Sequence, residues 1–333
     1  MKPVTMADVA ALANVSKSTV SQYINNRYDY MSEETKLRIQ DAIQQLGYKP
    51  NYVAKSLKQK QTSTIGVIVA NILHTFSTQV IRSIEDVCRE ANFHVIVCNA
   101  DDNPQQEREY IEMLRAKQID GLIVFPTGGN MALYESMVKE QYPLLFVDRL
   151  VHDLQVDSFL LDNEKASELA VDHLVENGYK RIGMLTTSLE TNITPRIERI
   201  SGYKKALKKH GLPVLEEYYT GVDVSRMEAV LDEMFRLPEP PEALIAGNDL
   251  TIMEILKFAK KRDLSIPQQV ALIGIDEVSF SGIYHPALTT IAQPAFEMGK
   301  KAAEKLLEQI KGSYEEQKEV RRFTPTIIIR EST

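Results

Sequence analysis

Cysteine is scarce in this chain of 333 residues, which contains only Cys88 and Cys98. Both cysteines stand in apolar surroundings and neither forms a Cys-x-x-Cys pair, so we expect no disulfide framework and no zinc site. Apolar runs are short too, because the longest covers residues 65–70 and cannot span a membrane. Asp8 interrupts the N-terminus before an apolar stretch of signal-peptide length can form. These absences favour a protein of the reducing cytoplasm.

Recognised catalytic signatures are missing as well. The sequence has no Gly-x-x-x-x-Gly-Lys-Ser/Thr phosphate loop, no Gly-x-Ser-x-Gly nucleophile elbow and no His-Glu-x-x-His zinc pair. Its six histidines show no metal-ligand spacing. We therefore expect that the protein is not an enzyme and uses neither a cofactor nor a metal.

The charge of the chain is unevenly distributed. The net charge is −7, which by itself argues against a nucleic-acid partner. Residues 1–64, however, hold nine Lys and Arg against five Asp and Glu, whereas the remainder holds 30 against 41. A cationic head on an anionic body favours a protein whose head alone meets phosphate, although chance can also produce such a difference.

Two short helices are predicted near the N-terminus. Thr5 is a suitable N-cap for a helix over residues 6–13, and Asp8 stands where a capping box places its acidic residue. Ser16 can cap a second helix over residues 17–25. A short turn between two short helices is the helix-turn-helix arrangement.

The second predicted helix separates polar from apolar residues. At 100° per residue its outward arc is polar: Lys17, Ser18, Ser21, Gln22 and Asn25. The apolar residues expected to form a small core are Val9, Leu12, Val20, Ile24, Ile39, Ile43 and Leu46. Such an arc fits the DNA major groove, where Ser, Gln and Asn can reach base edges and Lys17 can reach guanine or phosphate. Periodicity alone equally fits a helix that only faces solvent.

A third short helix is predicted in the segment that follows. Pro50 ends the preceding helix, Asn51 can cap a new one over residues 52–58, and a polar linker follows at residues 59–63. A helix of this length is not stable by itself, because isolated helices need about 12–15 residues. It must be held by DNA or by a partner helix, or else remain a frayed linker.

Beyond Thr64 the pattern changes to apolar strands that alternate with amphipathic helices. The predicted strands are residues 65–70, 94–98, 121–125 and 144–147 in a first series and 181–185, 243–246 and 270–275 in a second, with helices near 76–91 and 104–117. Continuous apolar strands of this kind form parallel sheets covered on both faces. We predict two doubly wound α/β lobes whose strand-end loops face a common cleft.

The loops after these strands carry polar side chains that can hydrogen-bond several hydroxyl groups of a carbohydrate. They are Asn71, His74, Asn99, Asp101, Thr127, Asp148, Arg149, Thr187, Arg199, Asn248, Asp249 and Asp276. Each residue taken singly is as readily a loop cap or a surface residue. As a set at strand ends they indicate a ligand site.

Several N-terminal segments, among them Ser18-Thr19-Val20-Ser21, Leu46-Gly47-Tyr48 and Ala54-Lys55-Ser56-Leu57, resemble the headpiece of the lac repressor family. The resemblance implies operator DNA contacts by Thr5, Ser16, Lys17, Ser18, Ser21, Gln22, Asn25, Tyr48, Asn51, Ala54, Lys55 and Leu57. In that family two hinge helices pair in the minor groove, and Leu57 stands where a leucine opens a base step.

The body resembles the same family at residues 146–149, 246–249, 274–277 and 286–291. This implies an effector site formed by Asn71, Phe76, Thr127, Asp148, Arg149, Arg199, Asn248 and Asp276. An aromatic residue that is common near Val224 is missing, which favours a more polar ligand. Because the lobes of this family exchange strands, we expect residues 323–329 to return to the sheets.

Within the family, residues 21–24, 28–31 and 125–130 resemble repressors of 2-keto-3-deoxygluconate use. This implies a repressor of carbohydrate or sugar-acid catabolic genes, with Arg149 and Arg199 pairing with the carboxylate of the effector. We also expect a homodimer on a near-palindromic operator, because one helix-turn-helix reads only a few base pairs and a symmetric pair doubles the contacts. The alternative class is a solute-binding protein without gene control, whose exported members carry a signal peptide and no helix-turn-helix.

The sequence thus predicts three parts. They are an all-α helix-turn-helix headpiece at residues 1–49, a hinge helix and linker at 50–63, and an effector-binding and dimerisation domain at 64–333. The last part is expected to contain two doubly wound parallel-sheet lobes of the periplasmic-binding-protein type.

Overall fold

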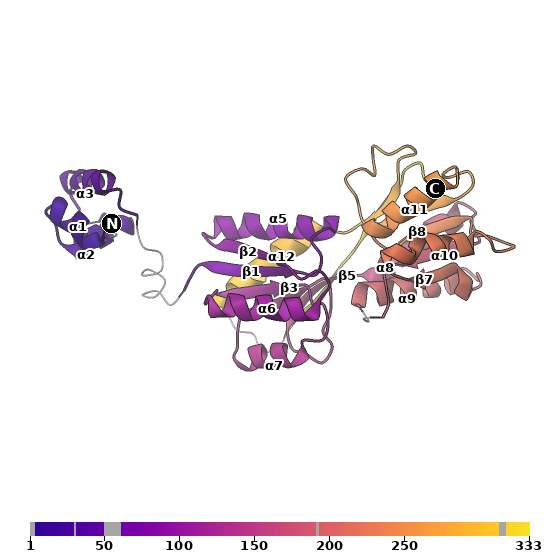
Figure 1. Cartoon of the computed structure of the whole chain (residues 1–333), viewed down its shortest axis with the longest axis horizontal. Coiled ribbons are helices and arrows are strands. Elements are labelled where there is room, and N and C mark those ends of the chain that lie inside the picture. The colour runs from indigo at the N-terminus through magenta and orange to yellow at the C-terminus, as the bar shows by residue number, and fades with distance from the viewer. Residues whose placement is uncertain (1–3, 30, 50–60, 191–192, 313–317) are drawn as a thin grey trace. The chain divides into compact units, whose positions relative to one another are not determined.

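The computed structural model describes residues 4–29, 31–49, 61–190, 193–312 and 318–333. The chain divides into two compact units, Met1–Thr62 and Ser63–Thr333. Figure 1 shows the first unit as helical and the second as built from helices and strands. The second unit begins one residue before the predicted start of the two-lobed body.

Three helices form the described part of the first unit: α1 (Met6–Leu12), α2 (Lys17–Ile24) and α3 (Glu33–Leu46). The Asp8 carboxylate accepts a hydrogen bond from the backbone N–H of Thr5 at 2.8 Å. Ser16 Oγ accepts one from the backbone N–H of Thr19 at 3.1 Å, which starts α2. The two predicted helices are confirmed, and each ends one residue early because its last predicted residue is the C-cap.

The core of this unit lies between the three helices. Its buried members are Val9, Ala10, Ala13, Val20, Ile39, Ala42 and Tyr48, and Ile24, Ile43 and Leu46 pack against them partly buried. The prediction that Leu12 belongs to this core is wrong, because its side chain is 49% exposed. At 100° per residue the buried arc of α1 runs through Val9, Ala13 and Ala10, which leaves Leu12 outside it.

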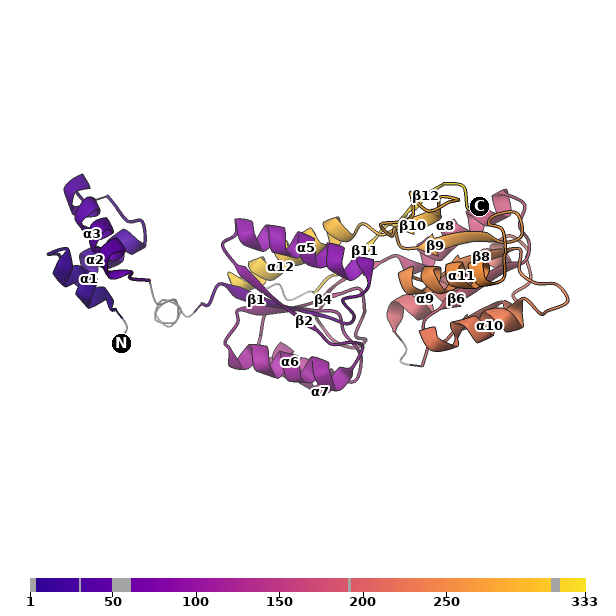
Figure 2. The same ribbon diagram turned by 45° about the horizontal axis from the view of Figure 1, so that its top comes forward.

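The first lobe of the second unit is a parallel sheet between two helical layers. Its order is β11-β5-β4-β3-β1-β2. Its elements are β1 (Thr64–Val69), α5 (Thr75–Glu90), β2 (His94–Asn99), α6 (Pro104–Ala116), β3 (Gly121–Val124), α7 (Met131–Lys139), β4 (Leu144–Val147), β5 (Asp157–Leu161), α12 (Ala295–Ile310) and β11 (Val320–Phe323). Helices α5 and α12 cover one face, and α6 and α7 cover the other (Figures 1 and 2).

The second lobe repeats this architecture in the order β12-β10-β9-β8-β6-β7, in which only β12 runs antiparallel to its neighbour. Its strands are β6 (Ile182–Thr186), β7 (Tyr219–Gly221), β8 (Ala243–Ala246), β9 (Ala271–Ile275), β10 (Thr289–Ala292) and β12 (Thr326–Ile328). Its helices are α8 (Asn163–Glu176), α9 (Thr194–Lys209), α10 (Met227–Met234) and α11 (Asp249–Lys261), with 3-10 turns η1 (Glu216–Tyr218) and η2 (Val224–Arg226). The predicted fold of two doubly wound lobes is confirmed.

The strands are apolar on both faces because both faces are covered. In β1, Ile65, Val67 and Val69 belong to the core beneath α5 and α12, whereas Ile68 belongs to the core on the opposite face. Helices α5 and α12 lie close together at Gly299, where a Cβ atom would stand 2.6 Å from the carbonyl oxygen of Val80. This packing fixes α5, whose N-terminus borders the cleft described below.

Three connections between the lobes lie within the described residues. The chain passes from β5 into α8, from β10 through Gln293 into α12, and from β11 into β12. The expected return of residues 323–329 is therefore confirmed, with one strand added to each sheet. Sequence reasoning missed β5, which begins with the polar residues Asp157 and Ser158 although both are buried.

Among the helices of the described residues, none combines the length and the hydropathy needed to cross a membrane.

Candidate functional site

The outward face of α2 carries most of the predicted DNA contacts. Lys17, Ser18, Gln22 and Asn25 are exposed, and Ser21 is half-buried. The Nδ2 amide of Asn25 donates a hydrogen bond to the carbonyl oxygen of Ser21 at 2.8 Å. Part of the hydrogen-bonding capacity of Asn25 is therefore used at the end of the helix. The polar arc predicted from periodicity is therefore present on the surface of α2.

Three other predicted contacts have different surroundings. Thr5 and Ser16 are exposed and act as the N-terminal residues that start α1 and α2. A helix N-terminus favours phosphate, so this placement agrees with backbone contacts. Tyr48 is 8% exposed and belongs to the core cluster, so its side chain chiefly packs the three helices together. The predictions for Asn51, Ala54, Lys55 and Leu57 lie outside the described residues.

A cleft between the two lobes gathers the predicted effector residues. The space between its walls, including the solvent at its mouth, is about 490 Å³. Seven of the eight predicted residues line it: Asn71, Phe76, Asp148, Arg149, Arg199, Asn248 and Asp276. The loops at the carboxyl ends of both sheets therefore converge as the strand pattern predicts.

Thr127 is the exception, because it is not among the lining residues. Its backbone N–H donates a hydrogen bond to Glu107 Oε2 at 2.7 Å, and Glu107 also accepts hydrogen bonds from Asn130 and Tyr134. Glu107 is fully buried, and these donors satisfy its carboxylate. Thr127 is thus bound to α6 through its backbone, and its contact with an effector stays a prediction.

The cleft also has lining residues outside the predicted effector set. Among the polar ones are His74, Ser77, Arg196 and Gln293. Arg196 stands three residues before Arg199 in α9, so helical spacing was a signal that could have identified it. Gln293 follows β10, a strand that the sequence reading did not find.

Arg199 and Asn248 are fixed by contacts within the second lobe. Arg199 Nε donates to Asn163 Oδ1 at 2.9 Å, and its Nη1 donates to the carbonyl oxygen of Gly247 at 2.5 Å. Asn248 caps α11, since its Oδ1 accepts from the backbone N–H of Thr251 at 2.9 Å. Both side chains are therefore held in place before a ligand arrives, which lowers the entropic cost of binding.

Two aspartates of the cleft are held in strained backbone conformations. Asp148 has a φ of 70° and Asp276 a φ of 126°, values that residues with side chains rarely adopt. Burial raises the pKa of Asp148, while Arg149 and Arg199 act in the opposite direction. Burial also raises the pKa of Asp276, and Arg199 again opposes this. Strain of this kind concentrates at binding sites, and hydroxyl groups of a ligand can hydrogen-bond both carboxyl groups.

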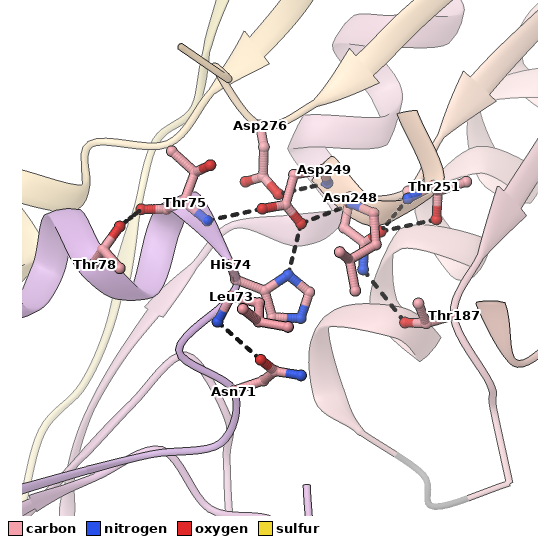
Figure 3. A network of polar contacts seen from close by, with 12 residues as sticks. Asn71, Leu73, His74, Thr75, Thr78, Thr187, Asn248, Asp249, Thr251 and Asp276 are labelled. Carbon is pink, nitrogen blue, oxygen red and sulfur yellow. Dashed lines mark hydrogen bonds and ion pairs between the residues drawn. The ribbon is translucent and has the colours of Figure 1, made fainter. Parts of the chain in front are cut away.

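A direct contact joins the lobes at His74 and Asp249 (Figure 3). His74 Nδ1 lies 2.6 Å from Asp249 Oδ1, and the backbone N–H of Thr75 donates to Asp249 Oδ2 at 2.8 Å. The backbone N–H of Asp249 in turn donates to Asp276 Oδ2 at 3.1 Å. We call His74 and Asp249 the interlobe pair. His74 itself lines the cleft, and the hydrogen bond to Asp276 connects Asp249 to a second lining residue.

The electrostatics of the pair favour its charged form. Burial lowers the pKa of His74, but the hydrogen bond that its ring donates to Asp249 and the negative charges of Asp249, Asp276 and Asp148 outweigh it, so the pKa is raised. Burial raises the pKa of Asp249, and its contacts with His74 and with backbone N–H groups reverse the shift. Opposite charges stabilise each other more strongly here than in water.

The described residues contain no group of His, Cys, Asp and Glu side chains arranged to hold a metal ion. What the cleft offers is hydrogen-bonding carboxyl, amide and guanidinium groups from two lobes. A headpiece with a polar reading helix and a two-lobed body with such a cleft define a DNA-binding transcriptional regulator that responds to a small ligand.

The chain belongs to the LacI family of bacterial regulatory proteins. The model of bacterial regulatory proteins of the lacI family matches residues 5–51. The model of periplasmic binding proteins and the sugar-binding domain of the LacI family matches residues 62–330. The headpiece match separates this chain from solute-binding proteins without gene control.

Related proteins match this chain along nearly its whole length. The probable HTH-type transcriptional regulator EndR of Paenibacillus polymyxa is 48% identical over 98% of both chains. The HTH-type transcriptional regulator KdgR of Bacillus subtilis (strain 168) is 34% identical, over 92% of this chain and 91% of its own. Among solved structures, the Lac repressor bound to ONPG in its repressed state has a TM-score of 0.86 at 24% identity over 100% of both chains. A complex of the transcriptional regulator CelR with cellobiose has a TM-score of 0.73 at 24% identity, over 99% of this chain and 100% of its own.

Proposed function

We propose that this regulator represses genes of carbohydrate or sugar-acid catabolism in the cytoplasm, and that a sugar acid such as 2-keto-3-deoxygluconate controls its operator affinity. The observation that carries the proposal is the meeting of Arg149, Arg196 and Arg199 in one cleft with Asp148 and Asp276. Guanidinium groups bind carboxylates by charge-assisted hydrogen bonds, and carboxyl groups bind sugar hydroxyls. One ligand that carries both groups satisfies both sets of residues.

The proposal includes a homodimer on a near-palindromic operator. A single helix-turn-helix reads only a few base pairs, and a symmetric pair doubles the contacts. The body exposes several large apolar side chains, among them Ile72, Leu73, Met253, Ile283 and Phe296. Ile72 and Leu73 precede α5, and Ser83 of α5 donates a hydrogen bond to the carbonyl oxygen of Phe296 at 2.6 Å. Exposed apolar side chains at this place, where α5 lies beside Phe296, favour burial against a second copy.

The proposed mechanism couples the cleft to the hinge. An effector that binds two lobe arrangements with different affinity shifts their populations, and the spacing of the two hinges then decides whether the hinge helices form. The predicted hinge helix lies outside the described residues, so this step rests on the length of that helix and on its position between the headpiece and the cleft.

A ligand screen tests the function directly. The full-length protein is titrated with 2-keto-3-deoxygluconate, galacturonate, glucose and cellobiose, and both unfolding temperature and operator affinity are measured. We expect a sugar acid to raise the unfolding temperature, because a ligand of the folded state stabilises it, and to change operator affinity. A response to the neutral sugars alone would refute the sugar-acid proposal.

Two variants locate the response in the cleft. Asp276→Asn and Arg199→Lys alter groups that line it but leave the headpiece unchanged. We expect both to keep operator binding in the absence of ligand and to lose most of the effector response. An unchanged effector response in both variants would place the ligand elsewhere.

A further inference from the structure

Asp102 lies between two cationic side chains that come from opposite lobes. Its Oδ1 is 2.7 Å from Nη1 of Arg149, which follows β4 in the first lobe. Its Oδ2 is 3.5 Å from Nη2 of Arg196, which belongs to α9 in the second lobe. Arg149 and Arg196 both line the cleft. The carboxylate of Asp102 thus occupies the kind of position that an anionic group of a ligand would take.

The backbone holds Asp102 in this place. Its φ is 56°, in the left-handed region, and its N–H donates to the carbonyl oxygen of Ala70 at 2.6 Å. The next residue, Asn103, caps α6 through its side chain. The turn is therefore tied both to the end of β1 and to a helix, and it holds the carboxylate of Asp102 beside Arg149 and Arg196, two residues that line the cleft.

The guanidinium of Arg149 is only partly used by the described residues. Its Nη1 donates to the carbonyl oxygen of Pro126 at 3.2 Å. Its Nε is buried without an acceptor within hydrogen-bond distance, since the nearest carboxylate oxygen, Oδ2 of Asp148, is 3.6 Å away. Asp102 Oδ1 approaches Arg149 closely but lies outside hydrogen-bonding direction, and no described group donates to it. A buried N–H without an acceptor costs free energy that a bound carboxylate would recover.

Arg196 is likewise a cationic side chain whose hydrogen-bonding groups are only partly used by the described residues. It is 13% exposed at its side chain, and its Nη1 donates to the carbonyl oxygen of Ser188 at 2.8 Å. Burial lowers its pKa, and the nearby positive charges of Arg149 and Arg199 lower it further, while Asp102 and Asp148 oppose them. The two guanidinium groups therefore face one shared carboxylate, with hydrogen-bonding capacity left over.

We propose that Arg149, Arg196 and Asp102 determine the charge selectivity of the effector site. Arg149 and Arg196 bind the carboxylate of the ligand from both lobes, and Asp102 competes with it for the same cations. Arg196 and Asp102 are thus specificity-determining residues beyond the effector set predicted from the sequence. This inference rests on the proposed function, because it assigns the place at which the acid group of a sugar acid binds.

The proposal predicts how charge selectivity changes in single variants. The measured quantity is the ratio of affinities for an acid and for its uncharged methyl ester, with 2-keto-3-deoxygluconate and galacturonate as the two acids. Arg196→Gln should lower the preference for the acid by roughly tenfold or more, the change expected when a hydrogen bond to a charged group is lost. Asp102→Asn should raise that preference, because it removes the competing negative charge.

The variants are chosen so that the fold survives. Asn adopts the left-handed conformation of Asp102 more readily than most residues, and Arg196→Lys keeps the positive charge as a second variant. Arg262→Gln and Asp232→Asn serve as matched controls, since these two residues pair with each other on the surface of the second lobe. The controls should leave the affinity ratio unchanged.

The outcomes separate this inference from the proposed function. If the wild-type protein binds neither acid, the proposed sugar-acid function is wrong and the inference fails with it. If the wild-type protein binds an acid but Arg196→Gln and Asp102→Asn keep its acid-to-ester ratio, the function stands and the inference is wrong. A loss of selectivity in Arg196→Gln together with a gain in Asp102→Asn supports both.

Discussion

His74 Nδ1 lies 2.6 Å from Asp249 Oδ1, and this contact joins the first residue before α5 to the first residue of α11. The two side chains are 16% and 7% exposed, so the pair is largely shielded from solvent. Because the two helices belong to different lobes, the contact can exist only while the lobes approach each other. The interlobe pair is therefore a direct reporter of cleft closure.

Breaking the interlobe pair should weaken effector binding. His74→Asn or Asp249→Asn removes a charge pair that favours the closed arrangement in which both lobes face the ligand. We expect a loss of affinity of about 5- to 150-fold, the range of coupling free energies of about 1–3 kcal/mol. Calorimetric titration of the effector measures this. His210→Asn is the matched control, because His210 forms a 2.6 Å contact with Asp172 within the second lobe. Equal losses in His74→Asn and the control would argue against a role in closure.

Effector affinity should also depend on pH through His74. The closed arrangement raises the pKa of His74 above its ordinary value near 6.5. Its stabilising contribution is therefore complete below that ordinary value and is lost as pH rises through the raised pKa. The lowered pKa of Asp249 sets the opposite limit, since its contribution is lost as pH falls through that value.

Titrations between about pH 5.5 and pH 9 test this dependence. Asp276 and Asp148 also face His74 and have raised pKa values of their own, so the comparison must isolate the histidine. We expect His74→Gln to reduce the decline in effector affinity at high pH, while any change in effector affinity at low pH persists. If effector affinity declines by the same amount in the variant, a titratable group other than His74 causes the decline.

The base preference of α2 should change when Gln22 is shortened. Gln22 is exposed on the outward face, and a bidentate amide contact to adenine is worth about 1–3 kcal/mol of discrimination. Gln22→Ala should relax one position of each operator half-site in a binding-site selection experiment. Gln45→Ala, an exposed glutamine of α3, should leave the consensus unchanged. If Gln22→Ala and the wild type select the same consensus sequence, Gln22 does not contact a base.

The hinge prediction can be tested without knowledge of its conformation. If Leu57 opens a base step, Leu57→Ala should lower specific operator affinity sharply and reduce DNA bending. Effector affinity in the absence of DNA should stay the same, because the cleft lies entirely in the second unit. Leu37→Ala is a suitable control, since Leu37 is a leucine of α3 that is 58% exposed. If Leu57→Ala bends operator DNA as the wild type does, the hinge only connects the headpiece to the body and does not deform the DNA.

The features that were predictable from the sequence depend on near neighbours in the chain. Ser16 caps α2 by accepting from Thr19, three residues later, and the capping contact of Thr5 with Asp8 spans the same distance. The apolar strands and the polar residues after them, such as Asp148 and Asp276, could be placed together because parallel strands end at one edge of a sheet. Local hydrogen bonding and topology therefore predicted the headpiece and most of the cleft.

Tertiary structure decided what depends on contacts between distant segments. Thr127 follows an apolar strand as Asp148 does, but the buried Glu107 accepts a hydrogen bond from its backbone N–H, and Thr127 is not among the residues that line the cleft. The partner of His74 is 175 residues away, and Asp102 meets Arg196 across 94 residues. Spacing along the chain carries no information about such pairs, because the docking of two lobes, rather than any local propensity, brings them within contact distance.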